Sequence, residues 1–161
     1  MAPTPAPLTT LAGTPWGDFG LIDSGHGRKL ERYGPVTVIR PEPQAMWAPA
    51  RDDWTADAEF VPASNDDGGG RWYYTDGKVL GSWPLSWEEV RFEASCTPFR
   101  HLGFFPDMPP VWQWLRDQVA PVEAPKFLNL FGYTGVGSLA LAAAGAEVVH
   151  VDASKKSVAQ A

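Results

Sequence analysis

Residues 126–152, KFLNLFGYTGVGSLALAAAGAEVVHVD, decide the fold of this chain. The apolar run KFLNLF leads into the glycine-rich segment GYTGVG, which is followed by the alanine-rich run SLALAAAG and by a second β-branched run, EVVHVD. These runs predict a strand, a tight turn, a helix that ends at Gly145 and a second strand. Strands joined through a helix are parallel, so the stretch predicts a βαβ unit.

The glycine turn of this unit predicts a ligand site. Glycine lets the backbone approach a ligand closely, and the first turn of a helix carries amides without helical partners. Ligands of open α/β folds bind at the carboxyl edge of the sheet, where Gly132, Gly135 and Gly137 lie. Asp152 ends the second strand, where a carboxylate can accept hydrogen bonds from both hydroxyls of a ribose. We therefore expect an adenosine-type cofactor here.

Two cofactor classes use this layout. Gly135, Gly137 and Ala140 have the GxGxxA spacing of a dinucleotide site, and Asp152 lies 17 residues beyond Gly135. An NAD-dependent oxidoreductase is therefore one interpretation. Against it, polar and aromatic side chains occupy the strand end and the turn, where a pyrophosphate-binding turn prefers small residues. These side chains are Asn129, Phe131 and Tyr133. A third interpretation is a non-enzymatic β-rich binding module whose βαβ unit holds no ligand.

Residues 127–161 resemble the cofactor-binding stretch of class I S-adenosylmethionine (SAM)-dependent methyltransferases, of the type that modifies cytosine C5 in large-subunit ribosomal RNA. That family follows a strand with N-L-F, a small residue and Y-T-G, and later has V-D-x-S-K; here the segments read NLFGYTG and VDASK. The resemblance implies that residues 131–137 hold the methionine part of SAM, that Asp152 binds the ribose and that Ser154 caps the next helix. The expected cofactor-binding residues are Asn129, Phe131, Gly132, Tyr133, Thr134, Gly135, Gly137, Asp152 and Ser154.

Residues 97–115, TPFRHLGFFPDMPPVWQWL, resemble more loosely the segment that precedes the core in these enzymes, which implies that Phe105 and Asp107 border the cofactor pocket. The family's catalytic Asp-Pro-Pro motif does not occur in this sequence. We therefore expect the chain to be the cofactor-binding part of a longer methyltransferase, inactive by itself, and no catalytic residue is predicted within it.

The residues before 106 predict a small antiparallel β-rich unit. Val36–Ile39 form one short strand, Asp76-Gly77 favours the turn of a β-hairpin, and residues 89–95 alternate as a half-buried strand does. Pro109 and Pro110 suit the first turn of a helix that ends near Pro121. The prediction is an α+β chain with a flexible leader over 1–15, a β-rich domain over 16–105 and the start of a Rossmann-like SAM-binding domain over 106–161.

Composition limits the partners. Hydrophobic residues make up 44% and charged residues 20%, which is ordinary for globular proteins, while the net charge of −6 does not favour an RNA acceptor. The methyl acceptor is therefore not identified by the sequence. The single Cys96 and the absence of clustered ligands predict no disulfide and no metal site, and residues 1–16 do not have the pattern expected of a signal peptide or a membrane span. We expect a cytoplasmic protein in which Cys96 packs and His101 is a hydrogen-bonded structural residue.

Overall fold

The computed structural model describes residues 8–63, 69–77 and 79–161. Its parallel βαβ unit is formed by β8 (Lys126–Asn129), α2 (Val136–Ala143) and β9 (Glu147–His150), and the helix α3 (Lys155–Gln160) follows. The two strands pair in register from Lys126 opposite Glu147 to Asn129 opposite His150. The βαβ prediction is therefore confirmed, as is the helix after Ser154.

The N-terminal region is β-rich, as predicted. Five strands form one sheet in chain order, with every pairing antiparallel except the short parallel pairing of β3 with β4. They are β1 (Phe19–Gly25), β2 (Arg28–Tyr33), β3 (Val36–Pro41), β4 (Ala58–Pro62) and β5 (Gly70–Tyr74). The 16 residues between β3 and β4 allow the chain to return and pair in parallel, which a tight hairpin turn does not.

The predicted hairpin around Asp76-Gly77 is wrong. Gly77 does turn with a φ of 72°, but β5 pairs with β4, and the next strand, β6 (Trp83–Trp87), pairs with β7 (Val90–Ala94). The aromatic pair Phe60 and Trp72, opposite each other across β4 and β5 with ring centroids 5.3 Å apart, explains the choice of partner. The hairpin of β6 and β7 turns at Glu88, which has a φ of 49°.

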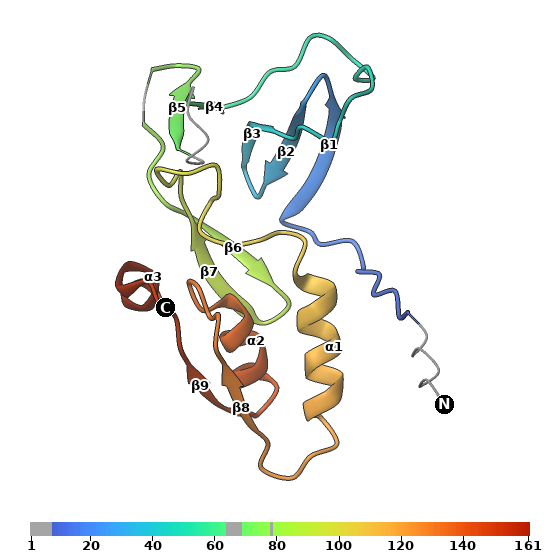
Figure 1. Cartoon of the computed structure of the whole chain (residues 1–161), viewed down its shortest axis with the longest axis vertical. Coiled ribbons are helices and arrows are strands. Elements are labelled where there is room, and N and C mark those ends of the chain that lie inside the picture. Colours follow the sequence, from blue (N-terminus) through green and yellow to red (C-terminus); the bar gives the residue numbers. More distant parts are fainter. Residues whose placement is uncertain (1–7, 64–68, 78) are drawn as a thin grey trace, which may run out of the picture.

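The helix α1 (Pro109–Val119) begins at the two prolines, as predicted. Its buried Trp112 packs edge to face on Trp87 of β6, with ring centroids 5.3 Å apart. In Figure 1 the β6–β7 hairpin lies between the five-stranded sheet and the βαβ unit. The largest core cluster accordingly draws side chains from all three parts, including Tyr33, Leu85 and Val136. The domain boundaries at residues 15 and 105 stay a prediction.

Candidate functional site

The turn between β8 and α2 is fixed to the end of β9 by backbone hydrogen bonds. The Val151 amide donates to the Asn129 carbonyl (2.8 Å) and the Gly132 amide donates to the Val151 carbonyl (2.9 Å). Tyr133 and Gly135 then take positive φ values of 50° and 91°, and Gly135 is the N-cap of α2. These contacts place the turn at the carboxyl edge of the parallel strands, where the sequence predicted a ligand site.

Asp152 joins this turn directly. Its Oδ2 accepts the Tyr133 amide and its Oδ1 accepts the Ser154 amide, both at 2.8 Å. These two hydrogen bonds hold the pKa of the Asp152 carboxyl below its usual value, and the bond from Ser154 has the larger effect. Each carboxylate oxygen has a second lone pair, so the group can still accept hydrogen bonds from a ligand. The glycine turn and the carboxylate that we expected to act together are therefore neighbours.

Two glycines of the turn, Gly132 and Gly135, leave no room for a Cβ without a shift of the neighbouring atoms, and a third, Gly137, leaves little room. A Cβ on Gly132 would lie 2.2 Å from Cε1 of His150, and one on Gly135 would lie 2.9 Å from Cβ of Ala161. A Cβ on Gly137 would lie 3.1 Å from Nε1 of Trp112. From the sequence we expected these glycines to let a ligand approach. In the structure, the space that each missing side chain leaves is filled by another residue of the chain.

A partly buried polar chain lies beneath the turn. The Asn129 side-chain amide donates to the Ser138 hydroxyl (3.0 Å), which is 2.9 Å from Nδ1 of His150. Nε2 of His150 is buried and has no hydrogen-bond partner among the described residues. The chain links β8, α2 and β9 at the level of Gly132. It therefore holds the strand end and the helix start in fixed positions relative to each other.

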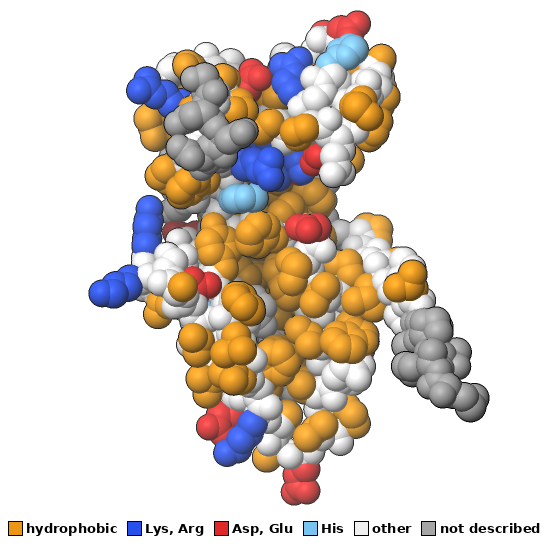
Figure 2. Space-filling view, in the orientation of Figure 1, with side chains coloured by type: hydrophobic (Ala, Val, Ile, Leu, Met, Phe, Trp, Pro, Cys, Tyr) orange, Lys and Arg blue, Asp and Glu red, His pale blue; other side chains and the backbone are white. Residues whose placement is uncertain are grey.

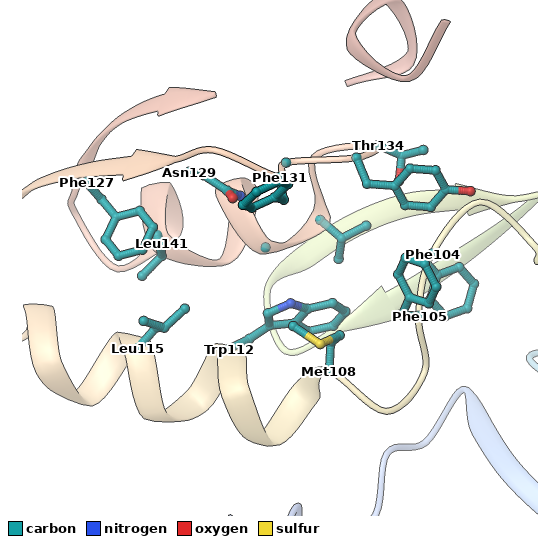
Figure 3. Close-up of a pocket in the computed structure, with 14 residues that line it drawn as sticks. Phe104, Phe105, Met108, Trp112, Leu115, Phe127, Asn129, Phe131, Thr134 and Leu141 are labelled. Carbon is teal, nitrogen blue, oxygen red and sulfur yellow. The ribbon is translucent and has the colours of Figure 1, made fainter. Parts of the chain in front are cut away.

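A cavity of about 310 Å³ opens between this turn and α1. Figure 3 shows Trp112 and Leu115 of α1 on one side, with Phe127 and Leu141 of the βαβ unit opposite them. We call this space the cofactor cavity. Its lining is largely hydrophobic and consists of Phe104, Phe105, Met108, Trp112, Leu115, Phe127, Asn129, Phe131, Gly132, Tyr133, Thr134, Val136, Gly137 and Leu141.

Most of the predicted site residues meet at this cavity. Six of them line it: Asn129, Phe131, Gly132, Tyr133, Thr134 and Gly137. Gly135, Asp152 and Ser154 do not, although Asp152 is hydrogen-bonded to the Tyr133 amide and to the Ser154 amide. The Ser154 hydroxyl accepts the Ser157 amide at 3.2 Å, so the predicted cap of α3 is confirmed.

The segment before α1 contributes one of the two residues expected from it. Phe105 lines the cofactor cavity, and its ring centroid lies 5.3 Å from that of Tyr133. Asp107 does not line this cavity, which corrects the expectation. The chain turns at Pro106 and Asp107, and this turn carries the Asp107 side chain into a neighbouring cavity instead.

The start of α2 offers hydrogen-bond donors to the cofactor cavity. The N-cap Gly135 has no side chain that could accept from the first turn, and the amides of Val136 and Gly137 have no acceptor within the described ranges. Both residues line the cavity. Free amides at a helix N-terminus suit an anionic group of a ligand, because they add to the positive end of the helix dipole.

Two residues of the site, Trp112 and His150, were not predicted from the sequence. Trp112 lies in the helix that the sequence predicts from Pro109, but nothing local indicates that its side chain would close the cavity. The sequence signal that could have indicated this contact is Gly137, because its missing side chain leaves room for the Trp112 ring. His150 alternates with Val149 and Val151 along the strand, which indicates a side chain facing α2, yet its contact with Ser138 depends on the fold.

Cys96 behaves as a packing residue, as expected, whereas the expected hydrogen bond of the His101 side chain is not found among the described residues and its ring packs instead. Burial raises the pKa of the Cys96 thiol to about 11, although a hydrogen bond with Tyr74 acts in the opposite direction. A thiol of this kind is a poor nucleophile near neutral pH. The His101 ring lies against Phe105, with centroids 4.9 Å apart, and burial together with Arg40, Arg100 and Lys29 lowers its pKa.

Two kinds of feature are not found in the described part of the chain. None of its helices is long and apolar enough to cross a membrane. Nor do three or more His, Cys, Asp or Glu side chains within residues 8–63, 69–77 and 79–161 come together as a metal site would require.

Comparison with known proteins connects this geometry to methyltransferases. No family model matches the chain. A SAM-dependent methyltransferase from Agrobacterium tumefaciens has a similar structure, with 51% identity and a TM-score of 0.82 over 89% of this chain and 46% of that one. An uncharacterized RNA methyltransferase from Thermosynechococcus vestitus is 34% identical over 96 residues, which are 58% of this chain and 21% of that protein.

Two further structures share the fold at low identity. A putative SAM-dependent methyltransferase from Streptococcus mutans matches 89% of this chain with a TM-score of 0.60 and 15% identity. A putative methyltransferase complexed with S-adenosylhomocysteine matches 83% with a TM-score of 0.55 and 16% identity. The chain spans 46%, 40% and 36% of these three structures. Its fold is that of the β-rich unit and the first βαβ of a Rossmann-like class I SAM-dependent methyltransferase.

Proposed function

We propose that this chain forms the SAM-binding part of a methyltransferase, with the cofactor held between the β8–α2 turn, α1 and Asp152. The observation that carries the proposal is the hydrogen bond from the Tyr133 amide to Asp152, because it joins the glycine turn and the strand-end carboxylate at one edge of the sheet. The 51% identity with the Agrobacterium tumefaciens methyltransferase supports the proposal. The sequence resemblance of residues 127–161 to class I SAM-dependent methyltransferases concerns the same residues.

The residues present fit the parts of SAM. The free amides of Val136 and Gly137 suit the carboxylate of the methionine moiety, and the remaining lone pairs of Asp152 suit the two ribose hydroxyls. The rings of Phe105 and Tyr133 line the cavity with centroids 5.3 Å apart, and their π systems would attract the positively charged sulfonium. A site with these three properties distinguishes SAM from an uncharged nucleoside.

The role of the chain is to bind and orient. When bound, SAM supplies a methyl group whose carbon forms a bond with an electron pair of the acceptor while the carbon–sulfur bond breaks toward sulfur, and the proton displaced from the acceptor leaves to a base or to solvent. The apolar lining at Trp112 and Phe104 excludes water from the reacting groups. Placing the two reactants correctly is the main part of such catalysis. We place the protein in the cytoplasm, because its one cysteine has no partner for a disulfide.

Calorimetric titrations of the chain with SAM, S-adenosylhomocysteine and NAD test this proposal. We expect both adenosyl ligands to bind and NAD not to bind, although the GxGxxA spacing makes NAD the necessary comparison. Asp152→Ala should weaken SAM binding by about 1–3 kcal/mol, the usual result of losing hydrogen bonds to a charged group. With labelled SAM, the chain alone should show no turnover, because its sequence lacks the Asp-Pro-Pro motif.

The matched control is Asp52→Ala, which removes an exposed carboxylate far from the cavity in sequence and without a partner in the described residues. It should leave the affinity for SAM unchanged. An Asp152→Ala variant that binds SAM as tightly as the native chain would show that this carboxylate does not hold the ribose. Binding of NAD in preference to SAM would overturn the proposal as a whole.

A further inference from the structure

The hydroxyl of Thr134 joins two segments of the cofactor cavity that are 31 positions apart in the chain. It donates a hydrogen bond to the carbonyl of Gly103, which belongs to the segment that leads into α1. Figure 3 shows Thr134 on the β8–α2 turn, with Phe104 and Phe105 of that segment below it. A hydroxyl has one proton to donate, so this proton is used within the protein. The side chain of Thr134 therefore acts on the geometry of the cavity.

This hydrogen bond connects the backbone next to two aromatic rings. Tyr133 directly precedes Thr134, and Phe105 lies two positions after Gly103. The intervening Phe104 is 2% exposed and belongs to the largest core cluster, so the backbone on this side is fixed in the core. The rings of Phe105 and Tyr133 meet with centroids 5.3 Å apart. The hydrogen bond from Thr134 to Gly103 therefore determines how these two rings lie relative to each other.

The backbone of Tyr133 has a conformation that needs support. Its φ of 50° lies in the left-handed region, which a residue other than glycine occupies only where its surroundings hold it there. On one side, its own amide donates to Oδ2 of Asp152 at 2.8 Å. On the other side, Thr134 is bonded to Gly103. The direction of the Tyr133 ring thus depends on both contacts.

The lining of the cofactor cavity contains no charged side chain. None of the 14 described residues that line it is acidic or basic, and Figure 2 shows a mostly hydrophobic surface over α1 and the βαβ unit. Burial, and with it the charge of Asp152, raises the pKa of Tyr133, so its hydroxyl stays protonated near neutral pH. Within this lining, the aromatic rings are the groups that attract a cation more strongly than a neutral atom of similar size.

The methyl donor and the product that remains after transfer differ in charge at one atom. SAM carries a positively charged sulfonium, whereas S-adenosylhomocysteine carries a neutral thioether in the same place. The ribose and the amino-acid end are the same in both, so hydrogen bonds from these parts to Asp152 and to the start of α2 do not separate the two ligands. A preference for the cation favours release of the product and binding of the next donor.

We propose that Thr134 is a positioning residue that sets the preference of the cofactor cavity for SAM over S-adenosylhomocysteine, by holding the rings of Phe105 and Tyr133 together beside the sulfonium. The inference rests on the proposed SAM-binding function. A ring attracts a cation only within about 6 Å of its centroid. A turn that is released from Gly103 therefore loses the attraction to the sulfonium, while the uncharged parts of the ligand keep their contacts.

Calorimetric titrations with SAM and with S-adenosylhomocysteine test the inference. We expect the native chain to prefer SAM by about 2- to 30-fold, the range of one cation–π contact. Thr134→Val keeps the shape of the side chain without the hydroxyl and should bring the ratio of the two affinities close to one. Thr134→Ser keeps the hydroxyl and should retain the preference. Phe105→Leu keeps an apolar side chain without a π system and should lower the ratio as Thr134→Val does.

Thr75→Val is the matched control. The Thr75 hydroxyl also donates to a backbone carbonyl, that of Ala56, and Thr75 does not line the cofactor cavity. This variant should leave the ratio of the two affinities unchanged. Repeating the titrations at high salt separates the rings from Asp152, because salt screens a solvent-accessible carboxylate far more than a ring contact. A preference that disappeared at high salt would assign it to Asp152 and overturn the inference.

The ratio of the affinities distinguishes positioning from a merely structural role. If Thr134→Val lowered the free energy of unfolding and weakened both ligands by the same factor, Thr134 would be structural and the inference would be wrong. Equal binding of SAM and S-adenosylhomocysteine by the native chain would also overturn it, while the proposed function would stand. Binding of neither ligand would refute the proposed function, and the inference with it. Should Thr134→Val not fold, Thr134→Ala takes its place, with the same expected ratio.

Discussion

At Gly132 the requirement for glycine comes from the protein itself. Its φ is not in the left-handed region, so the backbone conformation alone would accept alanine. The obstacle is His150, whose ring fills the space where a Cβ would lie and which is held by Ser138. A motif glycine that looks like a ligand contact in the sequence is therefore also a packing contact between the β8–α2 turn and β9.

Gly132→Ala should lower the free energy of unfolding by about 1–3 kcal/mol, the usual result of overpacking. In a His150→Ala background the same substitution should have a much smaller effect, because the ring that it meets is absent. Urea denaturation of the four proteins of this double-mutant cycle measures the coupling. Gly81→Ala is the control, since a Cβ at Gly81 meets no atom within 4 Å. Equal effects of Gly132→Ala in both backgrounds would contradict the assignment.

The reactivity of Cys96 is a second property that the surroundings of one residue determine. With a pKa of about 11, its thiolate forms only as the pH rises well above neutral. We expect alkylation by iodoacetamide at pH 8 to be about 100-fold slower than for a free thiol, and to accelerate as the pH approaches 11. Tyr74→Phe removes the hydrogen bond that lowers this pKa and should slow alkylation further. A rate at pH 8 equal to that of free cysteine would show that Cys96 is accessible and ionised.

Among the elements, α1 closes the cofactor cavity through one side chain. Trp112 is 5% exposed and contacts Trp87 of β6, while Trp114, two positions along the same helix, is 44% exposed. Trp112→Ala should therefore cost about 3–5 kcal/mol of stability and weaken SAM binding, whereas Trp114→Ala should cost much less. Chemical denaturation and SAM titration of both variants provide the comparison. Similar losses for the two would mean that α1 is not docked by its Trp112 face.

Prediction from the sequence succeeded where the signals were local. The β8–α2–β9 unit follows from apolar runs, a glycine turn and a helix stop at Gly145, and each of these is readable within a few residues. The position of Asp152 beside Tyr133 follows in turn, because strand ends of a parallel unit meet at one edge. Local signals are therefore sufficient to predict the side of the cofactor cavity that the β8–α2 turn forms.

Prediction failed where partners lie far apart in the chain. Asp76-Gly77 is a strong local turn signal, yet the partner of β5 is chosen by Phe60 opposite Trp72. The turn that joins the paired strands β6 and β7 contains Glu88, a residue with no particular preference for a positive φ. The hydrogen bond from Arg40 to the Arg100 carbonyl likewise spans 60 positions, and no local pattern indicates it.

For the whole molecule, the main question is whether residue 106 separates two units that fold independently. The sequence predicted a boundary there, because its pattern changes from that of β-strands to that of a helix. The largest core cluster nevertheless includes Tyr33 and Phe104 before this point and Trp112 and Ala140 after it. The ring centroids of Tyr33 and Phe104 are 5.8 Å apart, so the β-rich unit packs directly on the segment that leads into α1. A shared core makes unfolding of one part without the other unfavourable.

We therefore expect a single cooperative unfolding transition. Native-state hydrogen exchange should give the amides of Val38 in β3 and Leu141 in α2 the same opening free energy, equal to that of global unfolding by urea. Leu141 is the stricter probe, because it belongs to a smaller cluster with Val119 and Ala146 that lies outside the main core. If this amide opened at a distinctly lower free energy than Val38, the βαβ unit would be separately unstable and the boundary at residue 106 would be real. Equal values would establish that the β-rich unit and the βαβ unit unfold together, so that destabilising substitutions in β2 and β3 also lower the stability of the cofactor cavity.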